Sequence, residues 1–352
     1  MTMYVKPKYS ARDVNDAGEI IRRFRTDEGI SRADIKNAIS VIDNFRASHQ
    51  FPLNTFYMTL KNRASRVSPR AFVSQRNKRF PSIVQKLWDR PTMNLTQMQD
   101  IGGCRAVVPT IKQVYELRDT YFRRKLVHPF AGLSSGSAER DYVMDPKDSG
   151  YRSLHLKFRF NGRDRSAAYT GLRIEMQIRT ELQHKWATAV ETAGTFSRMA
   201  LKSNKGSPHW LRFFALMGSI FAQREGMPPV PGTTEANVIA EIKALNRKHY
   251  IAASFEQYRA IIPRFENRKD DKYFLVVLDP VKPEVLVKGF ARDAFPQANT
   301  EYADMERYYG EDSPVQIVLV SVEKVSDVMR AYPSFFLDTE DFLREVRAII
   351  DS

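Results

Sequence analysis

The chain has 352 residues, of which 43% are hydrophobic, and a formal net charge of +14. This hydrophobic content argues against extensive disorder, and the length allows two domains or one domain with large extensions. The positive charge favours polyanionic partners such as nucleotides or nucleic acids, without choosing between them.

The only cysteine, Cys104, excludes an intrachain disulfide, which agrees with a reducing compartment. No apolar run approaches the ~20 residues that a membrane span requires, and the N-terminus lacks the apolar stretch of a signal peptide. We therefore expect a soluble, cytoplasmic protein with no membrane partner.

The first fifty residues predict a helical leader. An apolar stripe that includes Val14 and Ile21 indicates a helix from Ser10 to about Phe24. Ser31 is a suitable N-cap for a second helix, and a third helical run follows from residue 52. We interpret these helices as packing scaffold.

A basic strand-to-helix junction comes next. Residues 71–78 predict a strand, and Pro81 fits the first turn of a following helix. The junction collects four cations: Arg76, Lys78, Arg79 and Lys86. Such a run is usually a solvated face, but alternate strand residues point the same way, so Arg76 and Lys78 could hold one polyphosphate together.

The segment QDIGGCRAVVP, residues 99–109, predicts a short buried strand. Asp100 lies at its start, and we expect this carboxylate at a strand position, with Arg105 further along. A helix is predicted from Ile111 to about residue 125 and a loop over 128–140, and Lys147 precedes the next strand.

Residues 151–179 predict an antiparallel hairpin, because two alternating strands flank a Gly-bearing turn. One face is apolar: Leu154, Leu156, Phe158, Phe160, Leu172, Ile174, Met176 and Ile178. The other face carries mainly Tyr151, His155, Lys157, Glu175, Gln177 and Arg179. The plainest interpretation is a polar face that meets water. A functional interpretation gains weight from the resemblance described below.

The rest of the chain predicts a helix that carries His184, Trp186 and Glu191, with Trp186 in the core. A connector over 194–208, an apolar helix over 209–224 and a Pro-rich linker over 227–234 follow. Beyond the linker we expect a long helix over 235–264, either continuous or broken, then three strands (273–279, 284–290, 315–322) and a helix over 340–350.

Four motifs occur in the order found in the synthetase domain of the RelA/SpoT alarmone enzymes, and the chain resembles that domain over about residues 51–196. The motifs are Arg-x-Lys with Ser-Ile-x-x-Lys (76–86), Asp-Ile-x-Gly-x-Arg in the form DIGGCR (100–105), GYRSLH (150–155) and Glu-x-Gln-x-Arg (175–179). The resemblance implies transfer of pyrophosphate from ATP to a ribose 3′-hydroxyl. We therefore expect an α+β fold with a mixed sheet of the nucleotidyltransferase-like type flanked by helices, divided into a leader (1–50), a synthetase domain (51–226) and a smaller C-terminal α+β domain (235–352).

The resemblance also assigns roles. It implies that Asp100 and Glu175 hold Mg²⁺, with Glu175 also activating the acceptor hydroxyl. It places Arg76, Lys78, Lys86 and Arg105 against ATP, and Tyr151, His155 and Lys147 against the acceptor. Gln177 and Arg179 are expected to support these groups.

Three functions stay open at this point. The first is synthesis of (p)ppGpp from ATP and GDP or GTP. The second is a toxin that pyrophosphorylates the 3′ end of tRNA, where the basic loop 163–165 would help. The third is a non-catalytic nucleic-acid-binding module, against which the Asp100/Glu175 pair argues.

Departures from the family pattern leave two further questions. The six histidines include no His-Asp pair, so we expect no hydrolase domain and a protein nearer the small alarmone synthetases. The segment TAVETAGTF stands where many alarmone synthetases have a Glu-His pair, which leaves the acceptor open. The C-terminal domain is either a stabilising appendage or an inhibitor whose acidic, Tyr-rich segment 302–312 faces the basic cleft, as in fused toxin–antitoxin members associated with phage defence.

Overall fold

The computed structural model describes residues 4–352 except 25, 28, 124–125, 132–138, 197–206, 234, 258–261, 267–269, 280–281, 283, 311–312, 314, 323–326 and 330–338. Parts of the predicted loop 128–140, of the predicted connector 194–208 and of the acidic segment 302–312 therefore lie outside the described residues.

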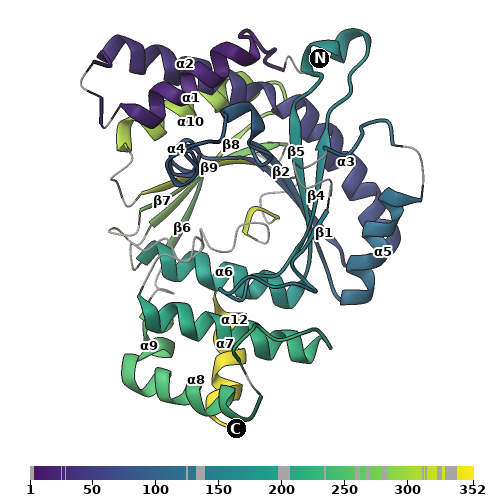
Figure 1. Ribbon diagram of the computed structural model, residues 1–352, viewed down its shortest axis with the longest axis vertical. Coiled ribbons are helices and arrows are strands. Elements are labelled where there is room, and N and C mark those ends of the chain that lie inside the picture. Colours follow the sequence, from purple (N-terminus) through teal and green to yellow (C-terminus); the bar gives the residue numbers. More distant parts are fainter. Residues whose placement is uncertain are drawn as a thin grey trace.

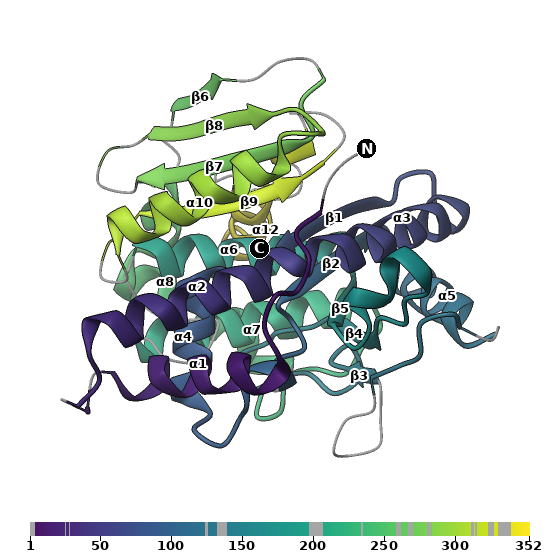
Figure 2. The ribbon, with the colours of Figure 1, turned by 90° about the horizontal axis from the view of Figure 1, so that it is seen from above.

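One mixed sheet organises the chain. Its described strands are β1 (Phe72–Asn77), β2 (Gly102–Val108), β3 (Glu139–Asp141), β4 (Leu154–Arg159), β5 (Arg173–Thr180), β6 (Ile262–Glu266), β7 (Tyr273–Asp279), β8 (Glu284–Phe290) and β9 (Gln316–Ser321). They lie in the order β3-β4-β5-β2-β1-β9-β7-β8-β6, as Figure 2 shows from above. The β2/β5 and β6/β8 pairs are parallel and the other pairs antiparallel. The predicted α+β class with a mixed sheet is confirmed.

The helices are α1 (Ala11–Arg23), α2 (Arg32–Ser48), α3 (Gln50–Val67), α4 (Phe80–Asp89), α5 (Ile111–Phe122), α6 (Glu181–Phe196), α7 (Pro208–Arg224), α8 (Glu235–His249), α9 (Ile251–Gln257), α10 (Phe295–Tyr309) and α12 (Glu340–Ile350). None within the described part of the chain is long and apolar enough to cross a bilayer. In Figure 1, α3 and α5 lie on the outer side of β1, β2, β4 and β5, and α7, α8, α9 and α12 gather at one end of the molecule.

The predicted hairpin forms from β4 and β5 with the expected division of faces. Leu154, Leu156 and Phe158 are buried in the core that α3 and α5 also line. Because successive strand residues point to opposite faces, His155 and Lys157 lie on the inner face of the sheet. The turn between the strands contains a short 3₁₀ helix over Asp164–Tyr169.

The helical leader packs against the helix of the basic junction. Ser10 and Ser31 each form a capping box that begins α1 and α2, as predicted for Ser31. Apolar residues of both helices share a core with Ile83, Val84 and Leu87 of α4. The leader therefore supports α4, which begins with Pro81 in its first turn.

A second helical core is built from α6, α7, α8, α9 and α12. The predicted linker 227–234 is packed onto this group: Val230 and Thr233 are buried, and the Thr233 and Ser219 hydroxyls are 2.7 Å apart. Hydrogen bonds and burial thus fix this Pro-rich segment in place.

Three expectations about local structure are wrong. The helix predicted over 235–264 allows a break, and one occurs at Tyr250, which has a φ of 50°; the prediction is wrong at its end, where residues 262–264 belong to strand β6. Residues 139–140 of the predicted loop belong to β3. Asp100 lies in the turn before β2 and not on a strand.

The C-terminal strands continue the sheet of the N-terminal strands. Strand β9 pairs with β1 through Gln75↔Ser321 and Arg76↔Val320. The inner face of β7, β8 and β9 shares an apolar core with Phe72 of β1, whereas α10 covers their other face. The segment predicted as a smaller domain is therefore joined to the rest by main-chain hydrogen bonds.

Candidate active site

Two cavities share the inner face of β1, β2, β4 and β5. The smaller has a volume of about 70 Å³ and the larger about 370 Å³. Five side chains line both cavities: Arg76, Asp100, Arg105, Glu175 and Gln177. The cavities therefore adjoin and form one site.

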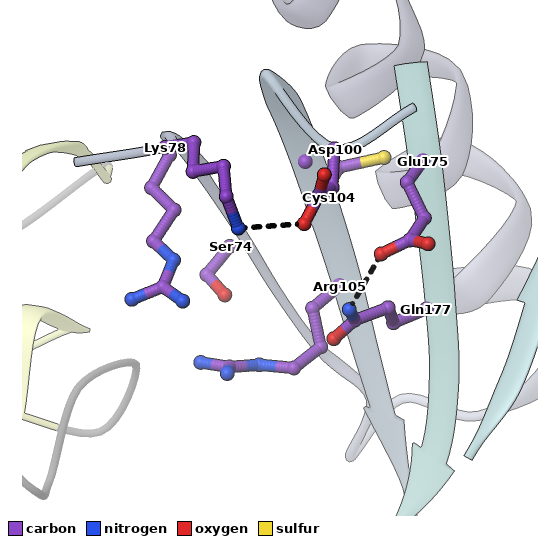
Figure 3. A pocket seen from close by; sticks show the side chains of 9 residues that line it. Ser74, Lys78, Asp100, Cys104, Arg105, Glu175 and Gln177 are labelled. Atoms are coloured by element: carbon purple, nitrogen blue, oxygen red, sulfur yellow. Dashed lines mark hydrogen bonds and ion pairs between the residues drawn. The ribbon is translucent and has the colours of Figure 1, made fainter. Parts of the chain in front are cut away.

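Every side chain predicted for the site lines this pair of cavities. Lys78 lines the smaller one, and Lys86, Lys147, Tyr151, His155 and Arg179 line the larger one, in addition to the five shared residues. Figure 3 shows Lys78, Asp100, Arg105 and Glu175 around the smaller cavity. The structure thus brings together residues that are spread from Arg76 to Arg179 in the chain.

Asp100 is held between two ammonium groups. Lys78 Nζ donates to its Oδ2 at 2.8 Å, and Lys86 Nζ donates to its Oδ1 at 2.7 Å. Burial opposes the charged form, but the two lysines outweigh it and hold the pKa of Asp100 well below its usual range. Although Lys78 follows the last residue of β1, it lines the same small cavity as Arg76.

Glu175 is the other carboxylate of the site. Its Oε1 lies 3.2 Å from His155 Nδ1, and its Oε2 accepts a hydrogen bond from Gln177 Nε2 at 2.9 Å. Burial raises its pKa, but attraction to His155 and the hydrogen bond from it lower the pKa to about 2. Electrostatic coupling with Asp100 raises it in turn, because the two carboxylates face the same space.

His155 connects Glu175 to Tyr151. The Tyr151 hydroxyl lies 2.8 Å from His155 Nε2. A carboxylate only accepts hydrogen bonds, so His155 Nδ1 donates to Glu175, and its Nε2 faces the tyrosine hydroxyl. Burial raises the pKa of Tyr151 to about 12, so this hydroxyl keeps its proton. The three groups form one ordered chain across β4 and β5.

Three guanidinium groups converge in the cavities. Burial, together with repulsion from Arg105 and Arg76, lowers the pKa of Arg179 to about 9. Like charges brought together in a partly buried site repel one another and are stabilised by an anion. The arrangement of Arg76, Arg105 and Arg179 is therefore that of a polyanion-binding site.

The far end of the larger cavity is aromatic. Lys147 Nζ lies 4.9 Å from the ring centroid of Tyr142 and 5.1 Å from that of Tyr151. Trp186 packs edge-on against Tyr151, and its Nε1 donates to the Phe214 carbonyl at 2.8 Å. The predicted core position of Trp186 is confirmed, and its ring also lines the cavity.

Sequence reasoning assigned no role to several lining residues. Lys157 sits two positions after His155 on the same face of β4, and burial lowers its pKa. Arg90 lines the larger cavity four residues after Lys86, one helical turn further along, and Tyr142 completes the aromatic end. The spacing of Lys157 from His155 on a strand, and of Arg90 from Lys86 along the chain, could have indicated that these two residues reach the site. Nothing in the sequence distinguishes Tyr142.

The acidic, Tyr-rich segment lies elsewhere. Its described residues 302–309 form the second half of α10, and Tyr302 lines a separate small cavity with Arg46 and Asn77. The expectation that this segment faces the basic cleft is therefore not met by its described residues.

Comparisons with known proteins locate the relationship. Residues 75–198 match the model of the region found in RelA/SpoT proteins. The chain is 33% identical over 123 residues to the GTP pyrophosphokinase YjbM of Bacillus subtilis. This alignment covers 34% of this chain and 54% of that protein. It is 33% identical over 111 residues to a guanosine-3′,5′-bis(diphosphate) 3′-pyrophosphohydrolase of Borreliella burgdorferi, covering 32% of this chain and 14% of that protein.

A solved structure of the small alarmone synthetase 1 of Bacillus subtilis, bound to its product pppGpp, aligns with a TM-score of 0.45 and 21% identity, over 53% of this chain and 93% of that one. The chain thus spans about half of the first curated relative and a small part of the second. The predicted site residues all fall within the matched segment. Over residues 75–198 this chain is thus similar to the region found in RelA/SpoT proteins.

Proposed function

We propose that this protein is a pyrophosphokinase that transfers pyrophosphate from ATP to the ribose 3′-hydroxyl of GDP or GTP. One observation carries the proposal: two carboxylates, Asp100 and Glu175, line the same cavity as the cations Arg76, Lys78 and Arg105. Phosphoryl-type transfers need little covalent chemistry from the protein, and they depend on placement and charge neutralisation. The name of the first curated relative, a GTP pyrophosphokinase, supports this class of reaction.

The carboxylates fit Mg²⁺. Hard oxygen ligands suit this ion, which commonly takes one or two protein carboxylates and completes its shell with water and phosphate oxygens. Within the described residues, no group of three or more Asp, Glu, His or Cys side chains could hold a metal by itself, so a sparse site of two carboxylates is the form that fits. When bound between Asp100 and Glu175, Mg²⁺ would neutralise charge on the transferred phosphates.

The cations would hold the ATP tail. Lys78 and Lys86 already neutralise Asp100 from the β1–α4 side, and Arg105 and Arg179 extend the positive surface along β2 and β5. Arginine contacts two phosphate oxygens at once, whereas lysine acts as a point charge. This division suits a polyphosphate whose β-phosphorus must lie near Glu175.

The acceptor would enter from the aromatic end. Tyr151 offers a ring for the guanine base, and Lys147 a charge for its phosphates. The 3′-oxygen would attack the β-phosphorus, its bond to phosphorus would form as the bond to the α–β bridging oxygen breaks, and AMP would leave. Because the pKa of Glu175 is about 2, this carboxylate would orient the hydroxyl and accept its proton only as the new bond forms.

Parallel labelling reactions test the proposal. The protein is incubated with ATP labelled in the β-phosphate together with GDP, GTP or bulk tRNA, and Glu175→Gln is the matched control. We expect label in the guanine nucleotide, release of AMP and no transfer by the variant. Label only in tRNA would replace the acceptor with the RNA 3′ end and support the toxin. Transfer to none of the three would refute the proposed function.

A further inference from the structure

Glu306 on α10 is a buried carboxylate outside the site. Only 7% of its side chain is exposed. Its Oε1 accepts hydrogen bonds from the backbone amide of Phe80 at 3.0 Å and from the Tyr302 hydroxyl at 2.8 Å. Its Oε2 lies 2.9 Å from Arg46 Nη2. A buried charge needs such partners. Here the Phe80 amide comes from α4, Arg46 comes from α2, and Tyr302 lies one turn away from Glu306 on α10.

Arg46 carries the contact onward to the backbone of the basic junction. Its Nε donates to the carbonyl oxygen of Lys78 at 3.1 Å, and its own carbonyl accepts from Asn77 Nδ2 at 3.2 Å. Burial opposes its charge, but attraction to Glu306 outweighs this and raises the pKa of Arg46. The guanidinium group therefore stays charged while it holds the end of β1.

Three consecutive residues of the β1–α4 junction are thus held from outside the site. Arg46 contacts the Lys78 carbonyl, Arg79 Nη1 donates to Gln316 Oε1 of β9 at 3.2 Å, and Glu306 contacts the Phe80 amide. The Phe80 amide is one of the unpaired donors at the N-terminus of α4, where a carboxylate is favourable. The backbone of the junction is consequently contacted by side chains of α2 and α10, and the Arg79 side chain by β9.

This junction determines where two site lysines can reach. Lys78 is the residue of the junction that follows β1, and Lys86 lies on α4, the helix that follows the junction. The Nζ atoms of the two lysines contact the two carboxylate oxygens of Asp100. A shift of the junction would move both ammonium groups relative to Asp100, and misplacement of about 1 Å in a site of this kind is costly.

We propose that Glu306 is a positioning residue: through Arg46 and the Phe80 amide it fixes the β1–α4 junction and so sets the phosphate-binding lysines. The C-terminal part of the chain then contributes to substrate binding without touching the substrate. The consequence for ATP binding rests on the proposed function, whereas the positioning of the junction does not.

The test compares two isosteric variants of the same helix. Glu306→Gln keeps the shape and removes the charge. The control, Glu301→Gln, removes the charge of a carboxylate that pairs with Lys288 of β8 and does not contact the junction. Two quantities are measured for each: the hydrogen-exchange rate of the Phe80 and Ile83 amides, and the Kd of α,β-methylene-ATP with Mg²⁺.

We expect Glu306→Gln to raise both the exchange rate and the Kd about tenfold, because charge-assisted hydrogen bonds are lost at the junction. The control should change neither quantity by more than about twofold. In transfer assays the KM for ATP should rise while kcat at saturating ATP falls by less than about threefold. Unchanged exchange in Glu306→Gln would overturn the positioning role.

A double variant separates positioning from bulk stability. Arg46→Met with Glu306→Leu replaces the ion pair by apolar side chains, which commonly preserves folding. A Tm like that of the wild type, combined with a Kd that stays high, supports the positioning role of Glu306. A Kd like that of the wild type contradicts it. If the wild-type protein does not bind the nucleotide analogue, the proposed function fails, and the exchange rates alone then decide whether Glu306 positions the junction.

Discussion

Replacing Asp100 with asparagine tests the electrostatic design of the site. The substitution keeps the size of the side chain and removes the charge that two lysines contact at 2.7 and 2.8 Å. The side chains of Lys78, Asp100 and Lys86 are 18%, 24% and 26% exposed. Exposed pairs contribute ~0–1 kcal/mol, whereas breaking a fully buried pair costs ~3–5 kcal/mol. We expect an intermediate loss of about 2 kcal/mol in the free energy of unfolding.

The same change should have opposite effects on two kinds of binding. At an effective dielectric constant of ~20, a unit charge ~6 Å away contributes roughly 3 kcal/mol before screening by salt. Without Mg²⁺, loss of the negative charge of Asp100 should therefore tighten the binding of inorganic triphosphate about tenfold. With Mg²⁺, transfer activity should fall by about 10³-fold, because one of two metal carboxylates is gone.

Three measurements check this prediction. Thermal unfolding should show a fall in Tm of about 4 °C, calorimetric titration gives the affinity for triphosphate with and without Mg²⁺, and the labelled-ATP assay gives the rate. Asp119→Asn is the control, because Asp119 pairs with Arg118 on the outer helix α5. The reasoning is refuted if triphosphate binding weakens in Asp100→Asn, or if Mg²⁺ strengthens it as much as in the wild type.

Further predictions concern the groups around Asp100. The pKa of Glu175 is lowered from 4.5 to about 2, so its charge stabilises the fold fully above pH 4.5 and this contribution is lost as the pH falls toward 2. The free energies of unfolding of the wild type and Glu175→Gln should therefore converge between pH 4.5 and 2. A constant difference over this range would contradict the prediction. Arg179→Met relieves repulsion from Arg105 and should leave Tm equal or higher while raising the Kd of α,β-methylene-ATP at least tenfold; unchanged affinity would argue against an anion site. Tyr151→Phe should lower kcat about tenfold through loss of the bond to His155, whereas Tyr151→Ala should also raise the KM for GDP about tenfold; equal effects would remove the stacking role.

The alternation of Leu154 to Phe160 and Leu172 to Ile178 predicted both the hairpin and its buried face, because a half-buried strand must repeat every two residues. Helix starts at Ser31 and Pro81 followed from local capping chemistry. The order of the family motifs grouped the site residues, which lie on inner-face strand positions, on α4, or in the segments next to β1, β2 and β4. Their catalytic roles stay predictions.

Long-range pairing could not be predicted from the same patterns. Apolar periodicity shows that residues 315–322 form a strand but not that β9 would pair with β1. Residues 262–264 are predicted as the end of a helix, because their strand character depends on a neighbour, β8, that comes later in the chain. Likewise, the acidity of the second half of α10 suggested a basic partner, and the structure supplies one in Arg46 of α2, far in sequence from the expected cleft.

The pairing of β1 with β9 limits how the C-terminal part can move. Two positions are paired, Gln75 with Ser321 and Arg76 with Val320, and main-chain hydrogen bonds join the two strands there. The C-terminal part could therefore not move away from the N-terminal strands as a rigid lid on a hinge. The hydrogen bonds between β1 and β9 would have to break first. Release of β9 would expose an unpaired edge of β1 beside the candidate site, so a change at the site and a change in the tendency to self-associate would occur together.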